Sequence, residues 1–233
     1  MRSSISAYST RGRQLDASRG LCYRFFEELQ MVRIGIWFAA APGVVGALLF
    51  LAGWPGLATA CLGMAGFVLF FFRDPERKIP AGPGLIVSPA DGRVLAVEPA
   101  EVEGEPRTRV SIFLSVFDVH VNRSPLRGTI RRVEYRPGRF HVASTNRAGE
   151  ENEQNVVLIQ GEQTRVVVKQ IAGILARRIE FWKRVGDSLA RGERVGMIRF
   201  GSRVEVLLDP RCRVQVRPGE HVRGGSSILA VLE

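Results

Sequence analysis

Histidine, the side chain best suited to acid–base chemistry near neutral pH, is rare in this 233-residue chain, and its copies lie far apart in the sequence. The histidines are His120, His141 and His221. His120 follows an alternating apolar and polar run and precedes a Ser-Pro turn, which predicts a place at the end of a strand, facing a cleft. The ordinary pKa of histidine suits a general base. Asp91 lies in an Ala-Asp-Gly turn and, taken alone, is a typical turn residue.

A Gly-Ser pair, Gly201-Ser202, interrupts an apparent strand in the stretch GMIRFGSRVEVLLDP. Glycine inside a strand usually marks a bulge or a close approach of another backbone. A serine hydroxyl is also a nucleophile, although a weak one that needs a base and a third group to orient that base. A second pair of the same form, Gly225-Ser226, occurs near the C-terminus.

Composition argues against several classes of site and partner. The cysteines Cys22, Cys61 and Cys212 have no CxxC spacing and no histidine cluster nearby, so we expect neither a disulfide framework nor a metal site. The formal net charge of +10 indicates an acidic partner. The excess arginine is scattered and not interleaved with aromatic residues, which favours an anionic membrane surface over nucleic acid.

Residues 34–72 carry no charged side chain and divide at Gly53-Trp54-Pro55-Gly56 into two apolar halves. Each half is close to the roughly 20 residues that a helix needs to cross a bilayer. Because Arg33 and Arg73 flank the run and its tip is uncharged, both ends are expected in the cytoplasm. The sequence therefore predicts a membrane hairpin, spanning or re-entrant, in the cell (inner) membrane. A buried helix pair of a soluble protein is the alternative.

Around the hairpin, the composition predicts three further segments. Residues 1–33 are expected to be polar and then amphipathic, with residues 21–31 at the membrane interface. Residues 73–87 are expected to form a linker, and residues 88–233 a β-rich domain. Short alternating runs separated by turn residues predict its strands, at 92–97, 109–114, 128–135, 155–159, 165–171, 195–200 and 203–208. Residues 174–182 predict either a helix or an extended connection.

Two stretches of the β-rich domain resemble each other, SPADGRV at 88–94 and VRGGSSILA at 222–230. Their glycine turns are typical of biotinyl and lipoyl carrier domains, so the fold class predicted is mainly β and barrel-sandwich-like. One possible function is therefore a membrane-tethered carrier or adaptor barrel without catalysis. A carrier needs a modifiable lysine at an exposed hairpin tip, and neither Lys169 nor Lys183 lies in a tight turn.

Several motifs in a fixed order point to one family. The uncharged hairpin is followed by FFRDPER and SPADGRV, and later by FDVHVNRSPLRG and RFGSRVEV. With these motifs the chain resembles phosphatidylserine decarboxylase, in the short form of that family, from about residue 25 to the end. The resemblance implies a membrane enzyme that converts phosphatidylserine to phosphatidylethanolamine without a metal. A decarboxylase of a soluble amino acid is disfavoured by the hairpin.

The resemblance also implies a proenzyme that cuts its own backbone between Gly201 and Ser202. The Ser202 hydroxyl would attack the Gly201 carbonyl, and elimination and hydrolysis would leave a covalent pyruvoyl group as the cofactor. His120 is implied as the base and Asp91 as the carboxylate that orients it. The pyruvoyl ketone would form a Schiff base with the substrate amine and accept electrons as CO₂ leaves. His120 is also the candidate proton donor in that step.

In one respect the chain departs from the family pattern. Longer bacterial members carry a second histidine three residues after the first, where this chain has Arg123. Either His120 serves both reactions or another group assists, and His141 is the reserve. Arg123 could instead bind the phosphate or the carboxylate of the substrate, and His141 is a second candidate for substrate binding.

The choice between the two Gly-Ser pairs depends on the size of the C-terminal fragment. A cut at Ser202 leaves a fragment of 32 residues, whereas a cut at Ser226 leaves eight. The longer fragment can contribute two or three strands to the sheet, so the resulting α and β chains are expected to stay associated. A homo-oligomer is also expected, and no nucleic acid partner.

Overall fold

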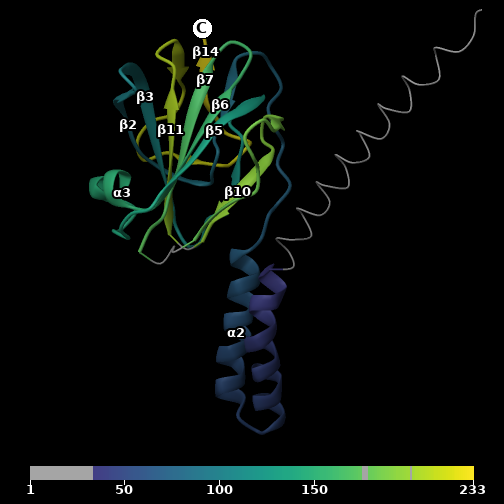
Figure 1. The fold of residues 1–233 in the computed structure, drawn as a ribbon. Coiled ribbons are helices and arrows are strands. Elements are labelled where there is room, and N and C mark those ends of the chain that lie inside the picture. Colours follow the sequence, from purple (N-terminus) through teal and green to yellow (C-terminus); the bar gives the residue numbers. More distant parts are fainter. Residues whose placement is uncertain (1–33, 175–177, 200) are drawn as a thin grey trace, which may run out of the picture. The chain divides into compact units, whose positions relative to one another are not determined.

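The computed structural model describes residues 34–174, 178–199 and 201–233. The chain divides into two compact units, Met1–Asp74 and Pro75–Glu233, which are treated separately (Figure 1). The polar and amphipathic segments predicted for residues 1–33 lie outside the described residues.

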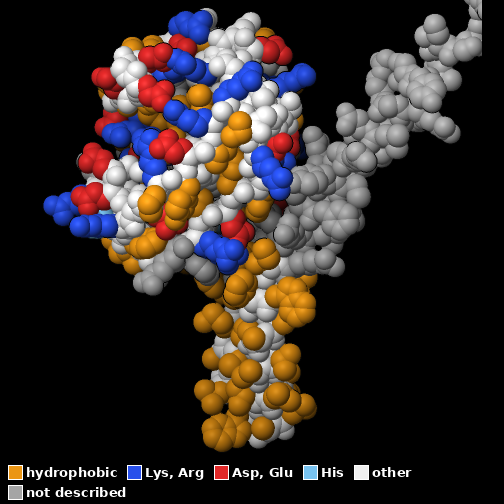
Figure 2. Space-filling model, viewed as in Figure 1, with side chains coloured by type: hydrophobic (Ala, Val, Ile, Leu, Met, Phe, Trp, Pro, Cys, Tyr) orange, Lys and Arg blue, Asp and Glu red, His pale blue; other side chains and the backbone are white. Residues whose placement is uncertain are grey.

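The first unit contains two apolar helices. One covers Ile34–Leu51, and the second, α2 (Pro55–Phe71), begins with a proline at its first turn, where the missing N–H costs nothing. Gly46 lets the helices approach closely, since a Cβ there would lie 3.2 Å from the Ala58 carbonyl oxygen. Ile34–Leu51 has a mean hydropathy of 2.1 and is long and apolar enough to cross a membrane by length and composition. Hydrophobic side chains cover the visible surface of both helices (Figure 2), so the predicted helical hairpin is confirmed.

The second unit is mainly β, as predicted. An eight-stranded sheet, in the order β13-β2-β3-β11-β7-β6-β5-β9, curls into a half-barrel (Figure 1). Its strands are β2 (Gly92–Val102), β3 (Glu105–Leu114), β5 (Gly128–Arg136), β6 (Gln154–Gln160), β7 (Arg165–Ile171), β9 (Ser188–Leu189), β11 (Ser202–Leu208) and β13 (His221–Val222).

Two three-stranded sheets complete this unit. The first has the order β4-β10-β8, with β4 (Val121–Arg123), β8 (Ile179–Phe181) and β10 (Arg194–Ile198). The second has the order β1-β14-β12, with β1 (Leu85–Val87), β12 (Cys212–Val214) and β14 (Ile228–Leu232). A short helix, α3 (Asn146–Glu151), precedes β6.

The seven expected strands are all present, with ends that differ by a few residues. For residues 174–182 the sequence left a helix or an extended connection open. In the described part of this segment the chain is extended, because Ile179–Phe181 forms β8 and pairs with β10. A helix over the whole of 174–182 is therefore wrong, since pairing with β10 overrides the apolar spacing. Leu85–Val87, expected at the end of the linker, forms β1 and pairs with β14.

The two similar stretches, SPADGRV and VRGGSSILA, lie against each other. The Ser88 N–H donates to the Ser227 carbonyl at 2.8 Å, and the Gly225 N–H donates to the Ser88 carbonyl at 2.7 Å. Their resemblance in sequence thus corresponds to two turns that are hydrogen-bonded to each other.

Strand β11 has two different faces. Val204, Val206 and Leu208 pack into the main core with side chains of the neighbouring strand β3. Side chains alternate along a strand, so Ser202 points to this same apolar side, while Arg203 and the other odd-numbered residues point to the opposite face.

The core around β11 supports a stability prediction. Ile112 is fully buried and lies between Val94 on β2 and Val204 on β11. Ile112→Ala should lower the free energy of unfolding by about 2–5 kcal/mol because it leaves a cavity. The thermal midpoint, followed by circular dichroism in detergent, should fall by roughly 5–15 °C. Val185→Ala, at an exposed position, is the control and should change stability by less than about 0.5 kcal/mol. Equal midpoints for both variants would contradict this description of the core.

Candidate active site

The Gly201–Ser202 peptide lies where the chain passes from one sheet to another. β10 belongs to the β4-β10-β8 sheet, whereas β11 begins at Ser202 in the eight-stranded sheet. Ile198 is paired with Ile179, and Ser202 is paired with Leu114. Gly201 has a φ of +57°, a left-handed conformation that favours glycine. Two sheets therefore fix the chain on both sides of this peptide.

Gly173 lies next to the Gly201 carbonyl. A Cβ added to Gly173 would collide with the Gly201 carbonyl oxygen, and it would lie 3.2 Å from Ala143 Cβ. Only glycine at position 173 leaves room for this carbonyl. Sequence analysis missed Gly173, and the only signal was a glycine soon after an expected strand.

The buried amide of Asn152 holds the two segments around Gly173. Its Nδ2 donates to the carbonyls of His141 at 2.9 Å and Ala172 at 2.7 Å, and its Oδ1 accepts the His141 N–H at 2.8 Å. This side chain joins the loop that carries His141 to the residue before Gly173. Sequence analysis also missed Asn152, because its partners lie 11 and 20 residues away.

The Ser202 hydroxyl is fully buried, and its Oγ has no hydrogen-bond partner among the residues described here. Buried hydroxyls are normally hydrogen-bonded, and the exceptions call for an explanation. A role as a reacting group would provide one.

His120 is fully buried beside the strand that leads to Gly201. Its Nδ1 lies 2.9 Å from the Asp118 carbonyl oxygen, and its own carbonyl accepts the Ile198 N–H at 3.3 Å. Because a carbonyl can only accept, we assign the proton of the neutral ring to Nδ1, which leaves the lone pair on Nε2. This is the tautomer that a general base requires.

Asp118 in turn is held by three contacts. Its carboxylate accepts the N–H and the hydroxyl of Ser115, both at 2.8 Å, and Oδ1 lies 2.9 Å from His221 Nε2. The loop that orients His120 is therefore fixed. The Ser-x-x-Asp spacing at 115–118 was the sequence signal for this turn, which the sequence analysis did not use.

Asp91 and Ser202 flank the same end of β3, from which the chain continues to His120. Arg93 pairs with Phe113, and Ser202 pairs with Leu114. The Asp91 carboxylate accepts from Arg77 Nη2 at 2.6 Å and from the Gly224 N–H at 2.8 Å. The hydrogen bonds described for Asp91 thus go to these groups, while His120 Nδ1 uses the Asp118 carbonyl. A role for Asp91 in orienting His120 stays a prediction.

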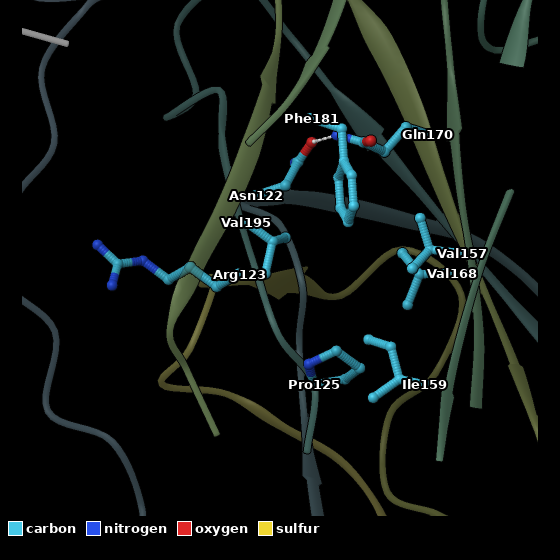
Figure 3. A pocket seen from close by; sticks show the side chains of 9 residues that line it. All are labelled: Asn122, Arg123, Pro125, Val157, Ile159, Val168, Gln170, Phe181 and Val195. Carbon is cyan, nitrogen blue, oxygen red and sulfur yellow. Dashed lines mark hydrogen bonds between the residues drawn. The ribbon is translucent and has the colours of Figure 1, made fainter. Parts of the chain in front are cut away.

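The two candidate substrate-binding residues lie in different surroundings. Arg123 is buried, and its Nη1 donates to the Gly192 carbonyl at 3.1 Å. In Figure 3 its guanidinium points away from the small apolar pocket that its backbone borders. His141 is partly exposed, with Nε2 3.0 Å from Glu151 Oε2, in the loop held by Asn152. Substrate binding by Arg123 or His141 stays a prediction.

The face of β11 opposite Ser202 carries a buried ion network. Arg203 Nη2 lies 2.8 Å from Glu205 Oε1, and Lys169 Nζ lies 3.8 Å from Glu205 Oε2. Burial lowers the pKa of both the Lys169 ammonium and the Arg203 guanidinium, and the charge of Glu205 opposes both shifts. Arg203 also donates to the Thr145 carbonyl at 3.3 Å, so the network ties the loop before α3 to β11.

Known proteins match this chain over nearly all of the β unit. Residues 64–230 match the family model described as phosphatidylserine decarboxylase. The chain is 52% identical over 202 residues to the phosphatidylserine decarboxylase proenzyme of Solibacter usitatus (strain Ellin6076), covering 87% of this chain and 97% of that protein. This chain belongs to the phosphatidylserine decarboxylase family.

Two further relatives of the family have the same name. The proenzyme of Symbiobacterium thermophilum (strain DSM 24528 / JCM 14929 / IAM 14863 / T) is 47% identical over 209 residues, covering 87% of this chain and 95% of that protein. The proenzyme of Burkholderia cenocepacia (strain HI2424) is 45% identical over 206 residues, with coverage of 87% and 96%. The resemblance drawn from the motifs is thus confirmed at the level of the family. The described part of the chain contains no group of three or more His, Cys, Asp or Glu side chains placed to hold a metal ion.

The contact between Gly173 and Gly201 supports a prediction about the cleavage that the motifs imply. Gly173→Ala should slow cleavage between Gly201 and Ser202 by about 100-fold, because the new Cβ displaces the Gly201 carbonyl. The measurement is the time course of fragment formation on denaturing gels. Gly128→Ala is the matched control: its Cβ would collide with the Gln160 carbonyl oxygen, away from Ser202, so it should lower stability but still permit cleavage. Wild-type cleavage of the Gly173 variant would contradict the prediction.

Proposed function

We propose that this chain is a proenzyme that cuts itself between Gly201 and Ser202, forms a pyruvoyl group from Ser202, and decarboxylates phosphatidylserine to phosphatidylethanolamine. The observation that carries the proposal is the geometry of this peptide. Gly201 is left-handed, and the Ser202 hydroxyl is buried without a described partner. Membership of the family supports the substrate.

The first step is transfer of the Gly201 acyl group from nitrogen to oxygen. His120 Nε2 takes the hydroxyl proton as Ser202 Oγ attacks the Gly201 carbonyl carbon. The bond from that carbon to the Ser202 nitrogen then breaks, and the nitrogen accepts a proton. The product is an ester that joins Gly201 to Ser202 Oγ, with a free amine on Ser202.

The second step is elimination. Loss of the Ser202 α-proton expels the Gly201 carboxylate, which becomes the new C-terminus, and leaves dehydroalanine at position 202. Its enamine tautomerises to an imine, and one water hydrolyses the imine to a ketone with release of ammonia. Once formed, the pyruvoyl ketone supplies an electron sink for the electrons released as CO₂ leaves. His120 is also the proposed proton donor to the product carbon.

Strand pairing supports stable association of the two fragments. β11 lies between β3 and β7, and its hydrogen bonds to both survive a cut before Ser202. β13 pairs with β2, and β14 pairs with β1. The short fragment is therefore paired with the long one at several places, as an α chain held by a β chain requires.

The apolar hairpin and the net charge of +10 support a site at an anionic membrane. The arginines that flank the hairpin support the cytoplasmic face of the cell membrane. The carrier alternative receives no such support, because Lys183 is buried and pairs with Glu193 at 3.1 Å, and Lys169 pairs with Glu205. Neither lysine is at an exposed hairpin tip.

A pair of serine variants tests the proposed function. Ser202→Ala should remain one chain and release no CO₂ from phosphatidylserine, because it has no hydroxyl to attack or eliminate. Ser226→Ala, at the second Gly-Ser pair, should be cut and active. The measurements are gel electrophoresis and release of labelled CO₂ in mixed micelles. Decarboxylation by the Ser202 variant, or loss of cleavage only in the Ser226 variant, would contradict the proposal.

A variant of Arg123 tests whether this residue binds the substrate, because cleavage and substrate binding can be measured separately. If its guanidinium binds the substrate phosphate or carboxylate, Arg123→Ala should be cut at the normal rate and should raise the apparent KM by about tenfold or more. Arg213→Ala, at an exposed ion pair with Glu233, is the control and should leave the cleavage rate and the apparent KM unchanged. If Arg123→Ala instead lowers the thermal midpoint and leaves KM unchanged, the contact with the Gly192 carbonyl is structural and the binding role is wrong.

A further inference from the structure

Exposed hydrophobic side chains of the β unit gather at one end of it. Among the described residues of this unit, the large hydrophobic side chains that are exposed are Phe117, Tyr135, Phe140, Val142, Ile174 and Val185. All of them except Val185 lie at the end of the sheet where β11 begins with Ser202. Exposed apolar side chains that occur singly need no explanation, but a group from separate loops at one place indicates an interaction surface.

Strand register places these side chains together. Leu114 pairs with Ser202, Ile171 pairs with Arg203 and Gln154, and Gln154 pairs with Arg136. These residues mark one edge of the curled sheet.

The loops that leave this edge carry the exposed side chains. Phe117 follows β3, Ile174 follows β7, and Phe140 and Val142 lie between β5 and β6. We call Phe117, Phe140, Val142 and Ile174 the apolar rim.

Val185 is a natural control because it lies elsewhere. The neighbouring Gly186 N–H donates to the Ile130 carbonyl, in the first half of β5. Ile130 is six residues from Arg136 along this strand, which corresponds to roughly 20 Å. The exposure of Val185 is 60%, comparable with the 66% of Phe117.

The loops of the rim also carry exposed cations. The Arg139 side chain is 77% exposed and lies 3.7 Å from Glu151, and the Arg178 side chain is 71% exposed and lies 3.5 Å from Glu180. Arg147 on α3 is also exposed, and the structure describes no ion pair for it. Aromatic and aliphatic side chains next to arginines are typical of surfaces that enter the interface of an anionic bilayer. In Figure 2 hydrophobic side chains gather near α3 on this part of the β unit, with blue side chains beside them.

The chain itself favours a bilayer as the occupant. α2 ends at Phe71 and the β unit begins at Pro75. A hairpin inserted in a membrane would therefore hold this unit at the lipid surface, whichever of its faces it turned toward the lipid. Ser202 is fully buried and lies at the same end of the sheet as the apolar rim, so a path between the loops of the rim would bring a lipid head group to it.

We propose that the apolar rim inserts into the interfacial region of an anionic phospholipid bilayer, and that lipid enters the site between its loops. This inference rests on the proposed function only for the identity of the lipid that enters. The insertion itself can be tested without any reaction.

The test of insertion uses the full chain in nanodiscs of phosphatidylcholine and phosphatidylglycerol, neither of which is the proposed substrate. Cys22 and Cys61 are replaced by serine, while Cys212 is kept because it is buried and will not react with the label. Phe117→Cys, Val142→Cys and Val185→Cys each provide one site for a bimane probe. Quenching by lipid with a doxyl group on its acyl chain reports contact with the bilayer.

We expect blue-shifted emission and strong quenching at positions 117 and 142, and weak quenching at 185. Equal quenching at all three positions, or none at the rim, would overturn the proposal. Blue-shifted emission that doxyl lipid does not quench would mean that protein, such as a second copy of the chain, covers the rim, and it would overturn the proposal as well.

A second experiment tests lipid entry. The double variant Phe117→Asp, Val142→Asp should lose about tenfold or more in the rate with phosphatidylserine in vesicles, since two charges oppose insertion. With monomeric short-chain phosphatidylserine it should keep the wild-type rate within about twofold, because no bilayer is involved. Val185→Asp should be normal with both substrates. Equal loss with both substrates would overturn lipid entry through the rim. If the wild-type protein acts on neither substrate, the proposed function fails, and the probe experiment still decides the insertion.

Discussion

The chain passes between two sheets at Gly201–Ser202, and the rest of the candidate site depends on this constraint. Ile198 is fixed by pairing with β8, and Ser202 is fixed by pairing with β3. Only two residues separate Ile198 from Gly201, so the length of chain between the two sheets is short. Gly201 itself has a left-handed φ. A peptide held in this way presents its carbonyl in one orientation. A cut there also leaves every strand intact, because it falls between β10 and β11.

The surroundings of this peptide divide into two sides with different physical tasks. On the apolar side the Ser202 hydroxyl is removed from water, so the proposed attack needs a base from the protein, and the proposal assigns this role to the buried His120. On the other side Arg203, Glu205 and Lys169 place two cations around one carboxylate under α3. This network does not face Ser202, but it fixes the strand and the loop that borders Gly173. The ion network and the proposed nucleophile therefore lie on alternate residues of one strand.

Much of the fold followed from sequence patterns that are local. Hydropathy was enough to predict the hairpin, and two-residue alternation was enough to predict seven of the strands. At 174–182 the apolar spacing left a helix and an extended chain open, and only the pairing of β8 with β10 decides between them. Most of the strands that were missed have two or three residues, too few to show a periodicity, and the five-residue β14 (Ile228–Leu232) was missed as well. The positions of these strands depend on partners far along the chain.

The candidate site depended on motifs shared with the family. These motifs singled out Ser202 and His120, and the roles of both residues stay predictions. Gly173 and Asn152 could not be predicted, because their importance lies in contacts with residues that are distant in sequence. The partners of Asp91 could not be predicted either, because Arg77 lies near the start of the β unit in the sequence and Gly224 lies near its end.

The most direct test of the central claim is the intact mass of the purified protein under denaturing conditions. The account predicts two chains that break between Gly201 and Ser202. The C-terminal chain should be about 17 Da lighter than a peptide that begins with serine, because an amino group is replaced by a ketone when ammonia is lost. A preparation that decarboxylates phosphatidylserine while its mass shows one unbroken chain, or a break at another peptide, would contradict the account.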